Sequence, residues 1–163
     1  MQKKYSIKVL ITLALALFLN GFSIQAQSCD TQLNVFKNRD ARSATVNDPT
    51  KFKMEITNKS GRSQSYEIQS VVFEDPCEEI GITKSSAKRS SDLNVSIISG
   101  DTRSNFITVP AGGTTAFLAE ISVNVGTKLN VWKCVQLKAV SDACSKSDVT
   151  KLLKVYIPDP TEN

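Results

Sequence analysis

The chain of 163 residues contains no histidine. Histidine is the most usual general base in enzymes, so its absence excludes Ser-His-Asp and Cys-His catalytic arrangements. The four cysteines include no C-x-x-C pair, which argues further against a zinc site. A glycine-rich phosphate loop is also missing, because Gly112-Gly113 precedes a predicted strand and not a helix. We therefore expect no enzymatic activity, no cofactor and no metal ion.

Two weaker patterns keep an unusual enzyme as an alternative. Ser85-Ser86-Ala87-Lys88 matches Ser-x-x-Lys, but that motif needs a helix, and here it lies in a polar loop. The acidic pairs Glu74-Asp75 and Glu78-Glu79 flank Cys77 and have the chemistry of a calcium site or an acid/base pair. A solvated acidic loop is the interpretation that we prefer.

The chain has little net charge once its first 26 residues are set aside. The formal charge is +4, but Lys3, Lys4 and Lys8 supply three of these charges and no acid offsets them, which leaves +1 on residues 27–163. A near-neutral domain has no electrostatic reason to bind nucleic acid.

The first 26 residues resemble a bacterial signal peptide. A basic start is followed by an apolar run over residues 9–19, which is too short to span a bilayer, and then by Ile24-Gln25-Ala26. No second apolar run is long enough for a membrane span. We expect cleavage after Ala26 and export of residues 27–163 to the periplasm, the cell surface or the medium.

All four cysteines, Cys29, Cys77, Cys134 and Cys144, follow this segment. An even number of cysteines in an exported domain favours two disulfides. Zinc binding and lipidation of Cys29 are the alternatives. The sequence Ala26-Gln27-Ser28 before Cys29 is unlike a lipoprotein cleavage site, and lipidation would leave three cysteines that cannot pair evenly.

Apolar residues alternate with polar ones over short segments, which is the pattern of half-buried strands. Residues 51–74 look like a hairpin because Asn58-Lys59-Ser60-Gly61 is a turn cluster, and residues 76–91 form a long polar connection. About seven such strands predict an antiparallel sandwich. The alternating positions are Leu33 and Val35; Phe52, Met54 and Ile56; Tyr66 and Ile68; Leu93, Val95 and Ile97; Ile107 and Val109; Phe117, Ala119, Ile121 and Val123; Val135, Leu137 and Ala139; and Leu153, Val155 and Ile157.

Three runs resemble the bacterial immunoglobulin-like domains of secreted and cell-surface proteins. They are FKMEITNKSGRSQSYEIQ, ITVPAGGTTAFLAEISVNVGT and VQLKAVSDACSKSDVTKLLKVYI. The family motifs fall on Thr57-Asn58, on Pro110-Ala111-Gly112, and on Val135, Leu137, Ala139 and Ser141. The resemblance covers about 110 residues and implies an all-β, Ig-like β-sandwich over residues 27–163, but it says little about function.

The Ig-like fold implies which cysteines meet. Its third and sixth strands are neighbours in one sheet, which places Cys77, after the third strand, beside Cys134, at the start of the sixth. Cys29 then remains with Cys144 at the opposite end. We therefore expect the disulfides Cys77–Cys134 and Cys29–Cys144, out of three pairings that four cysteines allow.

Trp132 is the only tryptophan of the chain. If Trp132 and Tyr66 lie on an exposed sheet face, they would form a platform for a sugar or a protein; packing beside a disulfide at Cys134 is the alternative for Trp132. Asn58-Lys59-Ser60 and Asn94-Val95-Ser96 match the N-glycosylation pattern, which we interpret as chance.

These observations favour an exported, non-enzymatic Ig-like domain that binds a protein or a carbohydrate. The alternative is a structural or assembly subunit of an envelope or surface complex, such as a fimbrial or chaperone-like protein. An open edge strand beside an apolar groove would favour assembly by strand addition, whereas exposed aromatic side chains on a sheet would favour binding. The sequence names neither the ligand nor the oligomeric state.

Overall fold

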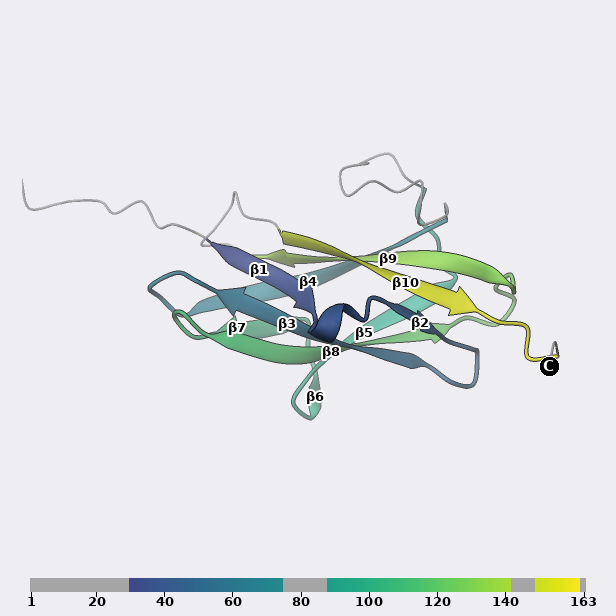
Figure 1. Ribbon diagram of the computed structural model, residues 1–163, viewed down its shortest axis with the longest axis horizontal. Coiled ribbons are helices and arrows are strands. Elements are labelled where there is room, and N and C mark those ends of the chain that lie inside the picture. Colours follow the sequence, from purple (N-terminus) through teal and green to yellow (C-terminus); the bar gives the residue numbers. More distant parts are fainter. Residues whose placement is uncertain (1–29, 75–87, 142–148, 162–163) are drawn as a thin grey trace, which may run out of the picture.

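The computed structural model describes residues 30–74, 88–141 and 149–161. In these ranges the chain forms two β-sheets with one short 3-10 turn and no α-helix (Figure 1). The predicted all-β sandwich is therefore confirmed. The expected signal peptide, most of the expected connection over residues 76–91, and Cys29, Cys77 and Cys144 lie outside the described residues.

Each sheet contains five strands, and the two shortest strands were not predicted from the sequence. The first sheet has the order β1-β3-β8-β5-β6, with β1 (Thr31–Val35), β3 (Thr50–Asn58), β8 (Thr114–Val123), β5 (Leu93–Ser99) and β6 (Thr102–Arg103). The second has the order β2-β10-β9-β4-β7, with β2 (Ala41–Ser43), β10 (Val149–Ile157), β9 (Val131–Val140), β4 (Gln64–Phe73) and β7 (Phe106–Val109). All residues of β2 and β6 are exposed, so these strands carry no apolar alternation that would reveal them.

The strand order is that of an immunoglobulin-like sandwich. If β1, β3, β4, β5, β8, β9 and β10 are taken as strands A to G, the first sheet contains A-B-E-D and the second G-F-C. This is the arrangement of the constant-type Ig fold. The third and sixth strands, β4 and β9, are neighbours as expected, and Phe73 lies opposite Cys134.

The period-two assignment of the core is confirmed. Phe52, Met54 and Ile56 on β3 are fully buried, whereas Lys51 and Lys53 between them are exposed. Val135, Leu137 and Ala139 on β9 and Leu153, Val155 and Ile157 on β10 belong to the same buried cluster. Apolar residues from both sheets thus form one core between them.

The predicted hairpin over residues 51–74 is wrong. β3 pairs with β1 and β8, whereas β4 pairs with β9 and β7, so the two consecutive strands belong to different sheets. Between them the chain crosses the end of the sandwich at the buried Asn58. Its side-chain amide donates hydrogen bonds to the carbonyls of Arg62 (2.7 Å), Val109 (3.2 Å) and Pro110 (3.1 Å), and these bonds fix the crossing.

The N-terminal part of the domain also changes sheets. β1 pairs antiparallel with β3, and the chain then passes through Lys37 and Asn38, whose φ angles are 55° and 53°. Such left-handed conformations are uncommon for residues other than glycine, and here they redirect the chain. It continues as β2, which pairs parallel with β10. β2 therefore lies next to the last residues of β10, at the end of the sandwich where the candidate site lies.

Candidate functional site

Large hydrophobic side chains that remain exposed gather at one end of the sandwich. Among the described residues, five are exposed, and only Phe106, at 64%, lies at the opposite end. The other four are Val46, Val125, Leu129 and Trp132. Together with the half-buried Tyr156 we call them the apolar end.

The strand register brings these residues to the same end. Trp132, near the start of β9, lies directly opposite Tyr156, near the end of β10. Ser43, the last residue of β2, lies beside Tyr156 on its other side. Val46 follows β2 and Val125 follows β8. Figure 1 shows the end of β10 beside β2 on the right of the molecule. The loops over residues 44–49 and 124–130 therefore flank the end of β10.

The two aromatic rings lie on the outer face of the second sheet. Their centroids are 5.2 Å apart and the ring planes are tilted by 43°, a favourable arrangement for an aromatic pair. The tyrosine hydroxyl donates to Asn130 Oδ1 (3.3 Å), and the same oxygen accepts from the backbone N–H of Asp159 (3.0 Å). Trp132 remains 44% exposed. The pair is therefore held in place while one ring faces solvent.

A tight turn presents Val125 to solvent. The N–H of Thr127 donates to the carbonyl of Asn124 (3.2 Å), and Gly126 between them has a φ of 86°. This is the pattern of a type II turn, which places glycine at its third position. Val125 at the second position is 88% exposed. Its exposure comes from a hydrogen-bonded turn.

The loop over residues 124–130 is also fastened to the segment before β5. The carbonyl of Asp92 accepts from the N–H of Asn124 (2.9 Å) and from the hydroxyl of Thr127 (3.1 Å). The side chain of Asn124 bonds to Ser91 and to Asn94. The side chains of Asn124 and Thr127 thus make internal bonds, while those of Val125 and Leu129 remain exposed.

An ion pair across the two sheets supports the same end. The Lys133 ammonium lies 2.6 Å from the Asp92 carboxylate, and the lysine side chain is only 10% exposed. The hydrogen bond from Lys133, followed by that from Ser90, lowers the pKa of Asp92 below its ordinary value of 3.8. Lys133 adjoins Trp132 on β9, so this pair connects the aromatic strand to the segment that holds the loop.

The structure separates the two residues that the sequence grouped as a possible binding face. Trp132 is exposed, as that hypothesis requires, but Tyr66 is only 1% exposed. Tyr66 alternates in phase with Ile68 toward the core, and its hydroxyl is hydrogen-bonded to the Thr31 hydroxyl (2.9 Å). The prediction for Tyr66 is wrong, because the tyrosine hydroxyl finds a partner inside the sandwich.

Cys134 lies on the outer face of the second sheet and is nevertheless fully buried. It forms a small cluster with Phe73, Val71 and Leu152, apart from the main core. No cysteine among the described residues is free. The partner predicted for Cys134, Cys77, lies outside the described residues, so both expected disulfides stay predictions.

The edge formed by β7 is protected against strand addition. The Ser104 hydroxyl accepts from the N–H of Phe106 (3.1 Å) and lies 3.3 Å from its carbonyl, to which it donates. The Thr115 hydroxyl donates to the carbonyl of Thr108 (3.3 Å). These side chains occupy backbone groups that an added strand would need.

The gap between β4 and β5 is closed at both ends. At one end, the backbone N–H of Ser104, in the segment between β6 and β7, donates to the carbonyl of Ile97 on β5. At the other, the N–H of Ser90 donates to the carbonyl of Val72 on β4. The chain crosses between the sheets at both positions, and a hollow of about 290 Å³ lies beside Val72, Ser90 and Leu93.

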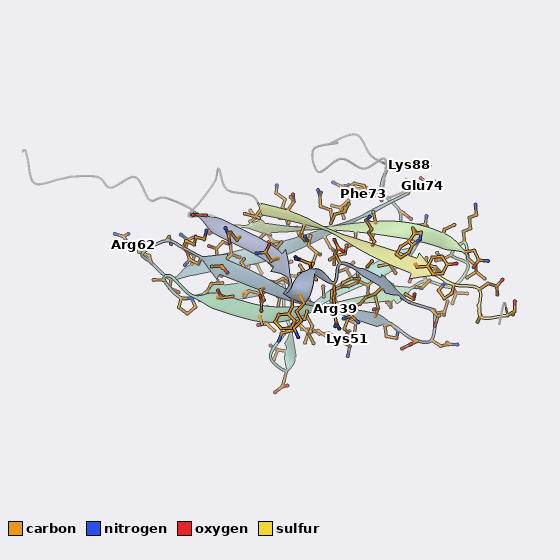
Figure 2. All side chains as sticks on the ribbon, viewed as in Figure 1. Arg39, Lys51, Arg62, Phe73, Glu74 and Lys88 are labelled. Atoms are coloured by element: carbon orange, nitrogen blue, oxygen red, sulfur yellow. The ribbon has the colours of Figure 1, made fainter. Side chains whose placement is uncertain are left out.

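The remaining candidates give no further site in the described ranges. Glu74 forms a 2.7 Å ion pair with Lys88 where β4 ends (Figure 2), and the other acidic residues of that segment lie outside the described residues, as do Ser85 and Ala87. Within the part of the chain that the structure describes, no group of three or more acidic, cysteine or histidine residues is close enough to hold a metal. No helix there is long and apolar enough to cross a membrane. Asn58 is buried, which excludes it as a glycosylation site.

The sequence did not reveal most of the apolar end. Val46, Val125 and Leu129 are isolated apolar residues in loops, and only the three-dimensional arrangement brings them together. Only Tyr156 was indicated by the sequence, because it alternates out of phase with the buried Val155 and Ile157. That alternation predicts an outward-facing ring.

Comparisons with known proteins identify similar folds. No protein-family model and no curated protein sequence matches this chain. A family 123 glycoside hydrolase from Clostridium perfringens is similar over 82% of this chain and 28% of its own, with a TM-score of 0.53 and 7% identity. A FixG-related protein from Vibrio parahaemolyticus is similar over 80% and 96%, with a TM-score of 0.48 and 10% identity. The periplasmic chaperone SfaE is similar over 80% and 58%, with a TM-score of 0.47 and 15% identity.

At these identities the similarity concerns the fold alone. This chain spans only 28% of the length of the glycoside hydrolase, so the activity of that enzyme does not carry over to it. The chain is an all-β domain with an Ig-like sandwich fold.

Proposed function

We propose that this domain is an exported, non-enzymatic interaction module that binds a protein partner through the apolar end. One observation carries the proposal: of the five large hydrophobic residues that are exposed in the described part of the chain, four lie at the end of the sandwich that also holds Tyr156. Scattered apolar residues are ordinary on protein surfaces, whereas a contiguous apolar patch marks an interaction site. Tryptophan and tyrosine are also enriched at the energetic centres of interfaces.

The internal order of this end supports the same conclusion. The turn that carries Val125 and the ion pair between Asp92 and Lys133 hold the exposed side chains in one arrangement. A preorganised surface loses little conformational entropy when it binds. An apolar surface held in this way is suited to recognition.

The polar groups near Trp132 favour a protein over a carbohydrate. A sugar site needs free donors and acceptors beside the stacking ring, to recognise hydroxyl groups. Here the oxygen of Asn130 accepts two internal bonds, and both ends of the Asn124 amide are engaged. The aliphatic side chains of Val125 and Leu129 complete a surface that fits an apolar protein patch.

The assembly role is included in this proposal as one kind of partner. If the partner is a subunit of an envelope complex, we expect it to contact the apolar end. Assembly by strand addition is disfavoured at β7 and in the gap between β4 and β5, for the reasons given above.

Site-specific photo-crosslinking in the producing cell tests the proposal. A photoreactive amino acid is placed at position 129, in the apolar end, and at position 106, the exposed aromatic position at the opposite end. We expect a discrete protein adduct from position 129 and none from position 106. The adduct should disappear when Trp132→Ala is introduced into the same chain.

Two outcomes would contradict the proposal. Adducts of equal yield from both positions would mean that the apolar end has no special role. A saturable change in Trp132 fluorescence with neutral oligosaccharides such as cellohexaose or chitohexaose would favour the carbohydrate interpretation instead. Because Trp132 is the only tryptophan, this signal reports on the apolar end alone.

A further inference from the structure

We infer that a second site, at the end of the sandwich opposite the apolar end, binds an uncharged oligosaccharide. In this site one sugar ring stacks on Phe106 and its hydroxyl groups donate hydrogen bonds to Glu67. The site is independent of the proposed function, because it uses a different surface and takes a different class of ligand. It is indicated by an exposed aromatic ring that lies beside polar groups free to bind.

The strand register places Phe106 and Glu67 side by side. Phe106, the first residue of β7, lies directly opposite Glu67 on β4. The next pair along the strands is hydrogen-bonded, since the N–H of Ile68 donates to the carbonyl of Asn105 (2.7 Å). Bonded and non-bonded pairs alternate in an antiparallel ladder, and side chains approach most closely in the non-bonded pairs. Glu67 and Phe106 form such a non-bonded pair, so the carboxylate and the ring are neighbours.

Both side chains belong to the outer face of the second sheet. Tyr66 and Ile107, which adjoin them in the chain, are buried in the core, so the alternation of the strands turns Glu67 and Phe106 outward. On the other side of β4, Val140 of β9 lies opposite Glu67. The carboxylate therefore lies in a row between an aromatic and an aliphatic side chain. In Figure 1, β7 is on the left of the molecule, whereas β2 is on the right.

A hollow of about 270 Å³ opens at this row. Its walls include Ser63, Ser65, Glu67, Phe106, Val140 and Ser141. The volume is just below the range of about 300–1,000 Å³ that is typical of drug-sized ligands. The hollow therefore suits a single sugar ring, with the remaining units of the oligosaccharide outside it.

The polar groups beside the ring are available to a ligand. The Glu67 carboxylate accepts one bond, from Gln69 Nε2 to Oε2 (3.0 Å), and within the described residues its Oε1 accepts none. Ser65 and Thr108 form the next non-bonded pair along the two strands. Both are exposed, and neither hydroxyl has a hydrogen-bond partner in the part of the chain that the structure describes. The polar groups near Trp132 are engaged internally, so the two exposed aromatic sites differ in this respect.

These groups together match the chemistry of a sugar. The C–H face of a pyranose ring packs on the negative face of an aromatic ring. Sugar hydroxyls donate charge-assisted hydrogen bonds to a carboxylate, and the hydroxyls of Ser65 and Thr108 can both donate and accept. The negative charge of Glu67 opposes an acidic sugar. An uncharged oligosaccharide is therefore the ligand that fits.

A cationic side chain is the competing ligand, because it also fits a ring beside a carboxylate. Two positive charges at this end act against it. Lys138 on β9 lies opposite Gln69, diagonally from Glu67. Arg62 is exposed in the turn before β4, on the left of Figure 2. Glu67 therefore does not make this end an acidic surface that attracts cations.

Amide NMR spectra of the isotope-labelled chain test this site. The probes are cellohexaose, chitohexaose, mannohexaose and galactotetraose. With at least one of them we expect saturable shifts of the Ser65, Glu67 and Phe106 amides, and a dissociation constant of about 0.1–5 mM because only one sugar ring is held. The indole N–H signal of Trp132 should not move.

Four variants show which side chains bind the sugar. Phe106→Ala should abolish the saturable shift of the Ser65 amide. Glu67→Gln keeps the shape of the side chain but replaces a charged acceptor with a neutral one, so the dissociation constant should rise about fivefold to tenfold. Trp132→Ala, at the other exposed aromatic position, and Glu55→Gln, a half-buried carboxylate on the first sheet, are the matched controls and should leave binding unchanged.

The absence of saturable shifts with all four sugars would overturn the assignment of this site, as would shifts that persist in Phe106→Ala. Binding of tetralysine that depends on Glu67, without binding of any sugar, would make the ligand a cation instead. Crosslinking from position 129 tests the proposed function separately, and a probe at position 106 replaces the ring on which the sugar stacks. If sugars bind beside Phe106 and position 129 gives no adduct, only the proposed function fails; the reverse result removes only the sugar site.

Discussion

The two ends of the sandwich differ in which side chains they bury and which they expose. At the end formed by the turn after β3, the buried Asn58 bonds to three carbonyls and accepts from the N–H and the hydroxyl of Ser60. Gln64 continues this network by donating to Ser60 and accepting from Ser141. Polar side chains there lie inside the fold and hold it together.

The apolar end also has a hydrogen-bonded loop, but its exposed surface is different. Asn124 and Thr127 make their bonds to the backbone beneath the loop, and Val125 and Leu129 point to solvent. Both ends are therefore ordered by side-chain bonds. The difference lies in what remains outside, and it shows that the exposed apolar residues do not result from a loosely held loop.

The largest expected effect concerns the disulfides, one of which we assign to each end. Cys77–Cys134 would fasten the apolar end, since Cys134 lies two residues from Trp132, and Cys29–Cys144 would fasten the other. Each closes a long loop and should contribute about 4 kcal/mol to the free energy of unfolding. Non-reducing peptide mapping should recover these two pairs. A peptide that links Cys134 to Cys144 would show that the two disulfides are not divided between the two ends in this way.

Asn58→Ala should break the polar end. It removes the donor from three carbonyls at a fully buried position, and we expect a loss of about 2–4 kcal/mol in urea unfolding. Asn47→Ala, in an exposed loop at the other end, is the control and should change the free energy by less than about 0.5 kcal/mol. Equal losses would contradict the structural role of Asn58.

Asp92→Asn should loosen the support of the apolar end. It deprives the buried Lys133 ammonium of its carboxylate, at an expected cost of about 1–3 kcal/mol. The folded state lowers the pKa of Asp92, so its stabilisation is complete above the ordinary value of 3.8 and is lost as the pH falls through the lowered pKa. Unfolding curves of the two proteins should therefore converge below about pH 4. A constant difference down to the lowest pH would contradict the assignment.

The sequence predicted the core strands because their two faces have different environments. In β3, the exposed Lys51 and Lys53 alternate with the buried Phe52 and Met54, and this contrast is visible in the sequence itself. Pairing partners are not visible in this way. A turn after Ile56 fits a hairpin as well as a crossing between sheets, and only Asn58 reaching Val109 and Pro110, far along the chain, decides between them.

The candidate site was predictable only in part. Trp132 could be named as a candidate from the sequence because it is the single tryptophan, and its ring is exposed in the structure. Tyr66 was assigned to the same face although its alternation with Ile68 already pointed inward. Val46 and Val125 reach the same end of the sandwich only through the order of the strands in the two sheets, a long-range arrangement that no local pattern contains.

The smallest effect on stability should come from Trp132→Ala, and this variant separates a role in binding from a role in folding most clearly. The ring is 44% exposed and contacts Tyr156, so its removal should cost less than about 1 kcal/mol. Binding by the apolar end should nevertheless be lost. Phe106→Ala, at the opposite end, should leave both stability and binding within error. A large loss of stability with Trp132→Ala would make the ring part of the packing and not a contact residue.

We expect the apolar end to be a solvent-facing surface that becomes covered on binding. Fluorescence of Trp132, the only tryptophan, measures this directly in the unmodified chain. In dilute solution we expect a red-shifted emission that acrylamide quenches, with a quenching constant between those of a buried indole and of the urea-unfolded chain. The emission should shift to the blue, and the quenching should fall, when the apolar end is occupied. A blue-shifted emission that acrylamide does not quench in the dilute native chain would show that Trp132 is buried and that the apolar end is not a solvent-facing surface.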